Sequence, residues 1–203
     1  MLEILVATHN VNKRREIKAL LKNFNKRTRV MNLDDLDTMP PMIVEDGKTF
    51  RQNAVKKAVT TSRFFNGLVV ADDSGLEADA LNGKPGIRSA RFARAKATDS
   101  ENNEKLLKLL DKVPKKDRKA RFVCNIALAA GGILLDTFEG TITGKILRSS
   151  RGNNGFGYDP VFVPDGYDKT FAEMAPSYKN RISHRGIALR QLKKTLKKYV
   201  EKN

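Results

Sequence analysis

The chain has 203 residues, enough for one domain with a sizeable core. Its 39 Lys and Arg residues outnumber its 23 Asp and Glu residues, so the formal net charge is +16. Hydrophobic residues make up 40% of the chain, which argues against disorder, and no apolar stretch approaches the roughly 18 residues that cross a membrane. The single cysteine, Cys124, excludes an intramolecular disulfide, and with only His9 and His184 beside it no closed zinc site can form. We therefore expect a soluble, cytoplasmic protein in which any metal is bound by oxygen.

The excess of positive charge is concentrated in two runs, residues 112–121 and 193–202. A basic surface attracts nucleic acid, anionic membranes or phosphorylated small molecules, and charge alone does not choose among them. Lysine-rich runs with few aromatic residues are typical of a solvated face, so we interpret both runs as solubilising.

The first half of the chain predicts a strand over residues 4–7, a polar turn, and a helix from Lys13. A second helix is predicted near Thr49, where Thr49 to Gln52 has the form of a capping box. Residues 68–71 then predict a short buried strand. The apolar residues expected on the inner faces of the two helices are Ile17, Leu20, Leu21, Phe24, Phe50, Ala54 and Ala58.

The second half predicts a capped helix from Thr98 that ends before Pro114. Two β-rich runs within residues 121–142 flank Gly131 and Gly132, a spacing that favours a tight antiparallel hairpin. A strand over 161–163 and a last helix complete the chain, and the last helix is expected to bury Ile187, Leu192, Leu196 and Tyr199. The sequence therefore predicts one α/β domain, residues 1–203, with a mixed central sheet.

The loop from Thr8 to Lys13 leaves the first strand and opens a helix. Free backbone N–H groups and the positive end of the helix dipole favour a phosphate there, and the lysine adds a full charge. The alternative is that Asn10 or Asn12 only caps the helix while Lys13 is solvated.

Two adjacent acids, Asp72 and Asp73, follow the predicted strand 68–71, and we place them at its carboxyl end. Ligand crevices of α/β sheets open at such ends, and neighbouring carboxylates there favour a hard cation such as Mg²⁺. A third acid, Glu45, precedes the Thr49 helix. The alternative is a simple turn in which Asp73 and Ser74 bond their own backbone and Gly75 supplies a positive φ.

The segment 155–160, GFGYDP, combines close-approach glycines, two aromatic rings and the acceptor Asp159, so a base could stack there. The alternative places Phe156 and Tyr158 in the core. Lys179 and the segment 183–185, SHR, are predicted to lie just before the last helix. The guanidinium of Arg185 and the ring of His184 can pair with the carbonyl edge of a base or with a phosphate. The alternative is that Ser183 caps the helix while His184 and Arg185 contact a neighbouring loop.

Together these segments resemble the inosine triphosphate pyrophosphatase family of non-canonical purine nucleoside triphosphate pyrophosphatases. The resemblance runs from Leu5 to Leu192 and is carried by ATHNVNKRREI, EDGKTFRQNAVKKA, VVADDSGLEADAL, GKPGIRSARFA, ARFVCNIAL, GNNGFGYDPVFVPDGYDKTFAEM and ISHRGIALRQL. It implies an elongated α/β fold with a mixed sheet, two lobes around a central nucleotide-binding cleft, and a homodimer. It also implies Mg²⁺-dependent hydrolysis of ITP, dITP or XTP to the monophosphate and pyrophosphate.

The resemblance implies a role for each site residue. Glu45 and Asp73 would bind the metal, with Asp73 as general base and Asp72 supporting it. The residues implied to contact substrate are Thr8, His9, Asn10, Val11, Asn12, Lys13, Ser74, Phe156, Gly157, Tyr158, Asp159, Lys179, His184 and Arg185. Within this set His9 departs from the family pattern, which often has glycine or an acid there.

Two other functions compete with this interpretation. A basic nucleic-acid-binding module would explain the charge but not the acids at 45, 72 and 73. A Maf-type pyrophosphatase acting on other nucleotides shares the general architecture, but GFGYDP and SHR do not suit it. Neither membrane nor nucleic acid is required for the favoured activity.

Overall fold

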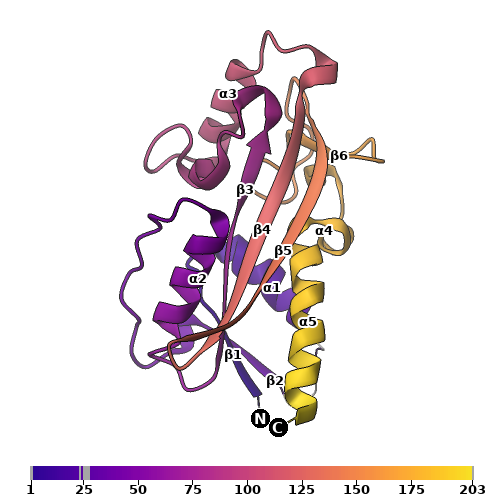
Figure 1. Cartoon of the computed structure of the whole chain (residues 1–203). Coiled ribbons are helices and arrows are strands. Elements are labelled where there is room, and N and C mark those ends of the chain that lie inside the picture. The colour runs from indigo at the N-terminus through magenta and orange to yellow at the C-terminus, as the bar shows by residue number, and fades with distance from the viewer. Residues whose placement is uncertain (1, 23, 25–27, 203) are drawn as a thin grey trace. The chain divides into compact units, whose positions relative to one another are not determined.

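The computed structural model describes residues 2–22, 24 and 28–202 (Figure 1). Six strands form one sheet in the order β2-β1-β3-β4-β5-β6. Strand β1 pairs in parallel with both β2 and β3, whereas β5 and β6 are antiparallel, so the predicted mixed sheet is confirmed. The strands are β1 (Leu2–Val6), β2 (Thr28–Asn32), β3 (Leu68–Ala78), β4 (Lys119–Ala130), β5 (Ile133–Ile146) and β6 (Phe162–Pro164).

The predicted helices are present, with adjusted boundaries. They are α1 (Val11–Leu21), α2 (Phe50–Thr61), α3 (Asp99–Leu109) and α5 (His184–Lys202), and the structure adds a short helix that was not predicted, α4 (Pro176–Ile182). The capping box at Thr98 is confirmed. At Thr49 it is only half formed, because Thr49 Oγ1 accepts from Gln52 N while Gln52 Oε1 accepts from Lys48 N. No helix among these residues is both long and apolar enough to cross a bilayer.

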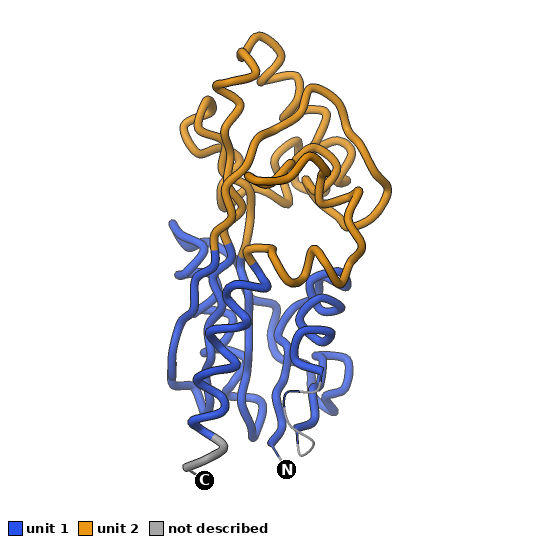
Figure 2. Tube along the Cα trace, turned by 90° about the vertical axis from the view of Figure 1, so that its right-hand side faces the viewer, with its two compact units in different colours: residues 1–73, 124–140, 185–203 blue, residues 74–123, 141–184 orange. Residues whose placement is uncertain are grey.

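The chain divides into two compact units, each assembled from separate stretches of sequence (Figure 2). Unit 1 comprises residues 1–73, 124–140 and 185–203, and unit 2 comprises residues 74–123 and 141–184.

Unit 1 is a three-layer α/β arrangement. Alternate residues of a strand point to opposite faces of its sheet, and each face of β3 has its own helices. The face that carries Leu68 and Val70 packs against α1 and α5, and the face that carries Val69 and Ala71 packs against α2. Helices on both faces are what a partly parallel sheet needs to bury its apolar residues.

Unit 2 has a separate core that includes Leu76, Leu106 and Leu110 and three phenylalanines in mutual ring contact, Phe122, Phe162 and Phe171. Arg118 lies within the first basic run, and the interpretation as a solvated residue is wrong for it. Its side chain is buried and donates to the carbonyl oxygens of Leu110, Ile146 and Leu147. The guanidinium thereby satisfies carbonyls at the end of α3 and the end of β5.

Two further predictions have opposite outcomes. The hairpin is confirmed, because Gly131 and Gly132 join β4 to β5 with φ values of 56° and 82°, which glycine adopts without a steric penalty. The burial of Tyr199 is wrong: this residue near the end of α5 is 40% exposed, whereas Leu192 and Leu196 are buried as predicted.

Candidate active site

The carboxyl end of β1 is the point where the chain order of unit 1 reverses. Strand β2 lies on one side of β1 and β3 on the other, with α1 and α2 packed on opposite faces (Figure 1). Doubly wound sheets bind ligands outside the strand ends at such a switch point. The loop that starts at Thr8 leaves β1 here and leads into α1.

Strand β3 continues beyond the end of β1. The pairing of the two strands stops at Val6 and Val70, whereas β3 runs on to Ala78. The prediction that Asp72 and Asp73 end a strand is therefore wrong, because they lie inside β3 beside the point where its neighbour stops. The alternative of a simple turn is also wrong. Gly75 allows a close approach instead, since a Cβ there would lie 2.2 Å from Ser89 Oγ.

The two adjacent acids point to opposite faces of the sheet. Asp72 has the parity of Leu68 and Val70 and so faces α1 and α5, while Asp73 has the parity of Val69 and Ala71 and faces α2. The two carboxylates therefore have different hydrogen-bond partners, and a supporting role of Asp72 for Asp73 stays a prediction.

On the first face, Asp72 is fully buried among cations. Its Oδ1 lies 3.4 Å from Lys13 Nζ, and its Oδ2 accepts from Arg185 Nε at 3.2 Å and Nη2 at 3.1 Å. Arg185 also pairs with Glu16 of α1, and the Cys124 thiol lies 3.9 Å from Asp72 Oδ2. Burial alone raises the pKa of Asp72, but the charges of Lys13 and Arg185 outweigh it and hold that pKa well below its usual value.

On the second face, Asp73 lies among residues of α2 and the loop before it. Asn53 Nδ2 donates to Asp73 Oδ2 at 2.9 Å, and Lys57 Nζ lies 3.7 Å from Asp73 Oδ1 and 2.6 Å from Glu45 Oε1. Burial raises the pKa of Asp73, and Lys57 and Lys13 only partly offset this effect. Burial alone lowers the pKa of Lys57, but the opposing charges of Asp73, Asp72 and Glu45 outweigh it and raise that pKa. The lysine therefore stays charged between the two carboxylates.

Sequence reasoning missed Asn53 and Lys57. Both lie on the predicted helix after Thr49, four residues apart and hence on one face. The available signal was this spacing of two polar residues on a helix that packs against the strand of Asp73. Lys57 is adjacent to Lys56, which pairs with Asp46 at the surface, so the sequence did not distinguish the buried lysine from the exposed one.

Asn10 caps helix α1, as one of the two alternatives for this loop predicted. Asn10 Oδ1 accepts from the backbone N–H groups of Asn12 and Lys13, both at 3.0 Å. Thr8 is buried and its Oγ1 accepts from Asn10 N, while His9 and Val11 are exposed. Lys13 is not solvated, because it pairs with Asp72.

In unit 2, residues 155–159 form a turn that we call the aromatic turn. Phe156 N donates to Asp159 Oδ2 at 2.9 Å, and the same carboxylate pairs with Lys179 of α4. The ammonium of Lys179 lies 4.7 Å from the centre of the Phe156 ring. The structure thus brings Lys179 to Phe156 and Asp159, although it lies 20 or more residues further along the chain.

Other predicted residues of unit 2 have different surroundings. The ring of Tyr158 is buried in the core and its hydroxyl donates to Ser89 O, so it offers no stacking face and its assignment as a base platform is wrong. His184 is buried and stacks on Phe122 at 4.7 Å. The segment 183–185 does not precede the last helix, because α5 begins at His184. Ser74 follows Asp73 on β3 and is half-buried.

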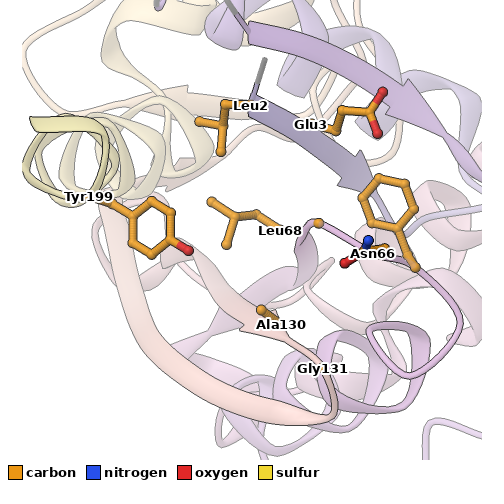
Figure 3. A pocket seen from close by; sticks show the side chains of 9 residues that line it. Leu2, Glu3, Asn66, Leu68, Ala130, Gly131 and Tyr199 are labelled. Atoms are coloured by element: carbon orange, nitrogen blue, oxygen red, sulfur yellow. The ribbon is translucent and has the colours of Figure 1, made fainter. Parts of the chain in front are cut away.

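A separate cavity of about 310 Å³ opens at the amino-terminal ends of β1 and β3 (Figure 3). The side chains of Leu2, Leu68 and Tyr199 point toward one another across it. None of the site residues predicted from the sequence lines it.

The donors beside Lys57 suit a hard divalent cation. Glu45 and Asp73 offer carboxylate oxygens that already converge on one positive charge, the Lys57 ammonium. Within the described part of the chain, no cluster of three or more His, Cys, Asp or Glu side chains is placed to hold a metal. Mg²⁺ is commonly held by one or two carboxylates together with substrate phosphates and water, so the two acids fit it.

The switch point of this doubly wound sheet is bordered by two lysines, Lys13 and Lys57, and by the carboxylates of Glu45 and Asp73. This arrangement is typical of α/β proteins that bind phosphorylated ligands. Comparison with known proteins gives the family: residues 4–195 match the model of the Ham1 family, and the chain belongs to that family.

Individual relatives agree over nearly the whole chain. A dITP/XTP pyrophosphatase of Desulfotalea psychrophila is 47% identical over 94% of this chain and 83% of its own length, and one of Oceanobacillus iheyensis is 45% identical over 97% and 98%. A solved HAM1 protein structure from Coxiella burnetii aligns with a TM-score of 0.86 at 40% identity, covering 98% of this chain and all of that one. The family resemblance and the α/β class inferred from the sequence are confirmed.

Proposed function

We propose that this chain is a nucleoside-triphosphate pyrophosphatase that hydrolyses dITP, ITP and XTP to the monophosphate and pyrophosphate, and so removes them from the nucleotide pool. The observation that carries the proposal is that a buried acid, Asp73, and Glu45 both pair with Lys57 beside the switch point of the sheet. The names of the curated relatives support the same chemistry.

The phosphates would bind beside the loop from Thr8 to Lys13. The positive end of the α1 dipole lies there, and Lys13 and Lys57 supply two full charges. Lys13 already pairs with Asp72, and Lys57 already pairs with Glu45, so a bound triphosphate would compete with these carboxylates for the two ammonium groups. Low exposure strengthens such interactions relative to those in water.

Glu45 and Asp73 would hold Mg²⁺, which when bound neutralises the negative charge of the phosphate oxygens. Asn53 fixes Oδ2 of Asp73 and is itself oriented by the N–H of Gly47, which donates to Asn53 Oδ1 at 2.8 Å. Asp73 would orient a water molecule and accept its proton. A carboxylate whose pKa is raised by burial is a stronger base than an exposed one.

For the purine, we propose recognition by the aromatic turn and Lys179. The Phe156 ring would stack on the base, and Asp159 and Lys179 would meet its polar edge. Donors that match a 6-oxo group are left unpaired by the 6-amino group of adenine, which costs about 1–3 kcal/mol per buried donor.

The resemblance also gives His184 and Arg185 a part in reading the base, and we retain this as a proposal. All three guanidinium nitrogens of Arg185 face Asp72 or Glu16. Contact with a base would therefore require Arg185 to exchange one of these partners. We further propose that the protein is a homodimer and acts in the cytoplasm.

The test is a panel of ITP, dITP, XTP, GTP, ATP and dTTP assayed with Mg²⁺ for the monophosphate and pyrophosphate. We expect fast turnover of the first three, slow turnover of GTP and ATP, and equal amounts of the two products. Release of orthophosphate, or a preference for dTTP, would contradict the proposal. Salt-dependent RNA binding measured alongside separates the enzyme from a nucleic-acid-binding module, which would bind strongly without hydrolysis.

A further inference from the structure

Helix α3 holds one residue of the aromatic turn, Gly157, by both of its backbone polar groups. The N–H of Gly157 donates to Asp99 Oδ2 at 2.7 Å, and Asn103 Nδ2 donates to the carbonyl oxygen of Gly157 at 2.8 Å. Asp99 and Asn103 are four residues apart on α3, so both project from one face of the helix. Two side chains thus fix both polar groups of a single residue 54 or more positions away in the sequence.

The aromatic turn borders a cavity on the side of α3. Gly155 and Gly157 have φ values of 77° and 63°, and Phe156 between them is not part of the hydrophobic core of unit 2. A cavity of about 360 Å³ lies against the turn and is lined by Asp99, Asn103 and Phe156 among others. On the side of this cavity the two hydrogen bonds from α3 restrain the turn, in addition to the contacts of Phe156 with Asp159 and Lys179.

Asn103 is costly for the stability of the fold. Its side chain is 6% exposed, and its Oδ1 has no hydrogen-bond partner within the described part of the chain. A buried and half-satisfied amide is destabilising relative to an apolar residue of similar size. Its neighbour Asn102 is 3% exposed but uses both polar atoms, accepting from Ala93 N and donating to Ala90 O.

We propose that Asp99 and Asn103 are positioning residues that hold the aromatic turn in register for the purine, and thereby set base selectivity. This inference rests on the proposed function. The two side chains act through Gly157: with its N–H and carbonyl fixed, the Phe156 ring keeps its orientation toward the base. Loss of either bond lets the turn shift, which weakens binding of the base in the ground state and the transition state alike.

The test compares Asn103→Ala and Asp99→Ala with a control and a rescue variant. Asn102→Ala is the control, because it removes a buried amide from the same helix without touching Gly157. Asp99→Asn is the rescue, because its amide oxygen can still accept from the Gly157 N–H while the charge near the start of α3 is lost. Each variant is assayed for kcat and KM with ITP and ATP, and its thermal unfolding midpoint is measured.

For Asn103→Ala and Asp99→Ala we expect KM for ITP to rise about three- to tenfold with kcat within about twofold, and the ITP preference over ATP to fall by a similar factor. Asn102→Ala should lose more thermal stability than Asn103→Ala yet keep the wild-type KM and selectivity. Asp99→Asn should keep the wild-type selectivity.

Three results would overturn the inference: wild-type KM and selectivity in both alanine variants, an equal loss of selectivity in Asn102→Ala, or an Asp99→Asn variant as unselective as Asp99→Ala. Failure of the wild-type enzyme to hydrolyse ITP would instead refute the proposed function.

Discussion

The two faces of β3 give adjacent carboxylates opposite environments. On the face toward α1 and α5, Asp72 is fully buried and held by Lys13 and Arg185, and its pKa is lowered. On the face toward α2, Asp73 accepts from the Asn53 amide and lies 3.7 Å from Lys57 Nζ, and burial raises its pKa. One residue step along a strand is enough to separate them, because the side-chain period is two.

The difference assigns one task to each acid. An acid locked between two cations is a poor base, since its proton affinity is low, whereas a buried acid with incomplete compensation accepts a proton more readily. Asp72 therefore anchors the cations of α1 and α5, and under the proposed function Asp73 is the acid that accepts the proton.

The largest effect is expected for Asp73→Asn. The amide cannot accept a proton from water, so kcat for ITP should fall by about 10³-fold, within the range for loss of a general base. Size and shape are nearly unchanged, so the folded state should persist. Pyrophosphate release measures kcat, and ITP binding by calorimetry should show a dissociation constant within a few-fold of wild type.

Asp79→Asn serves as the control, because Asp79 follows the end of the same strand but is exposed. It should have wild-type kcat. If Asp73→Asn retains more than about a tenth of wild-type turnover, proton transfer belongs to another residue.

Asp72→Asn is expected to affect stability rather than chemistry. It leaves the charges of Lys13 and Arg185 buried with one fewer partner, so the free energy of unfolding should fall by about 3 kcal/mol. Urea unfolding measures this loss. The control is Asp34→Asn, which breaks an ion pair with Arg14 at a largely exposed carboxylate and should cost less than about 1 kcal/mol. Equal losses in the two variants would remove the distinction.

The stability difference between wild type and Asp72→Asn should depend on pH. The folded-state pKa of Asp72 lies below the unfolded value of about 3.9, so in acid the unfolded chain binds a proton first. The contribution of Asp72 is therefore fully present above that value and is lost as the pH falls below it. Urea unfolding from pH 7 to pH 3 should show a constant gap above about pH 5 that narrows below about pH 4. A gap that widens in acid would contradict the lowered pKa.

Local signals in the sequence predicted most of the fold. Thr98 with Glu101 opens α3, and Gly131 with Gly132 turns the hairpin, because each of these interactions is completed within a few residues. The apolar run 68–71 likewise predicted the start of β3. Its continuation was missed, because Asp72 and Asp73 are rare within strands and their burial depends on distant cations.

The candidate site was predicted as a set of residue types, but not as a geometry. Lys13, Glu45 and Asp73 were identified from loop position and charge. The Arg185–Asp72 pair joins residues 113 apart, and the Arg185–Glu16 pair joins residues 169 apart, so no local pattern contains them. The alternation of side chains along β3 decides which helix each acid faces. Because the strand was predicted to end at Ala71, this alternation was not applied to Asp72 and Asp73.

The smallest effect is expected for Cys124→Ala. Cys124 lies on β4, is fully buried on the same face as Asp72, and its thiol lies 3.9 Å from Asp72 Oδ2. Burial raises the pKa of this thiol, so it remains protonated and donates weakly to the carboxylate. Its replacement loses that contact and leaves a small void, so unfolding should become about 1 kcal/mol easier, as judged by the urea midpoint. Turnover of ITP should be unchanged, because the hydrogen bond of the thiol is to the anchoring acid, Asp72. A fall in kcat of more than about tenfold without loss of ITP binding would place part of the chemistry on the face of Asp72.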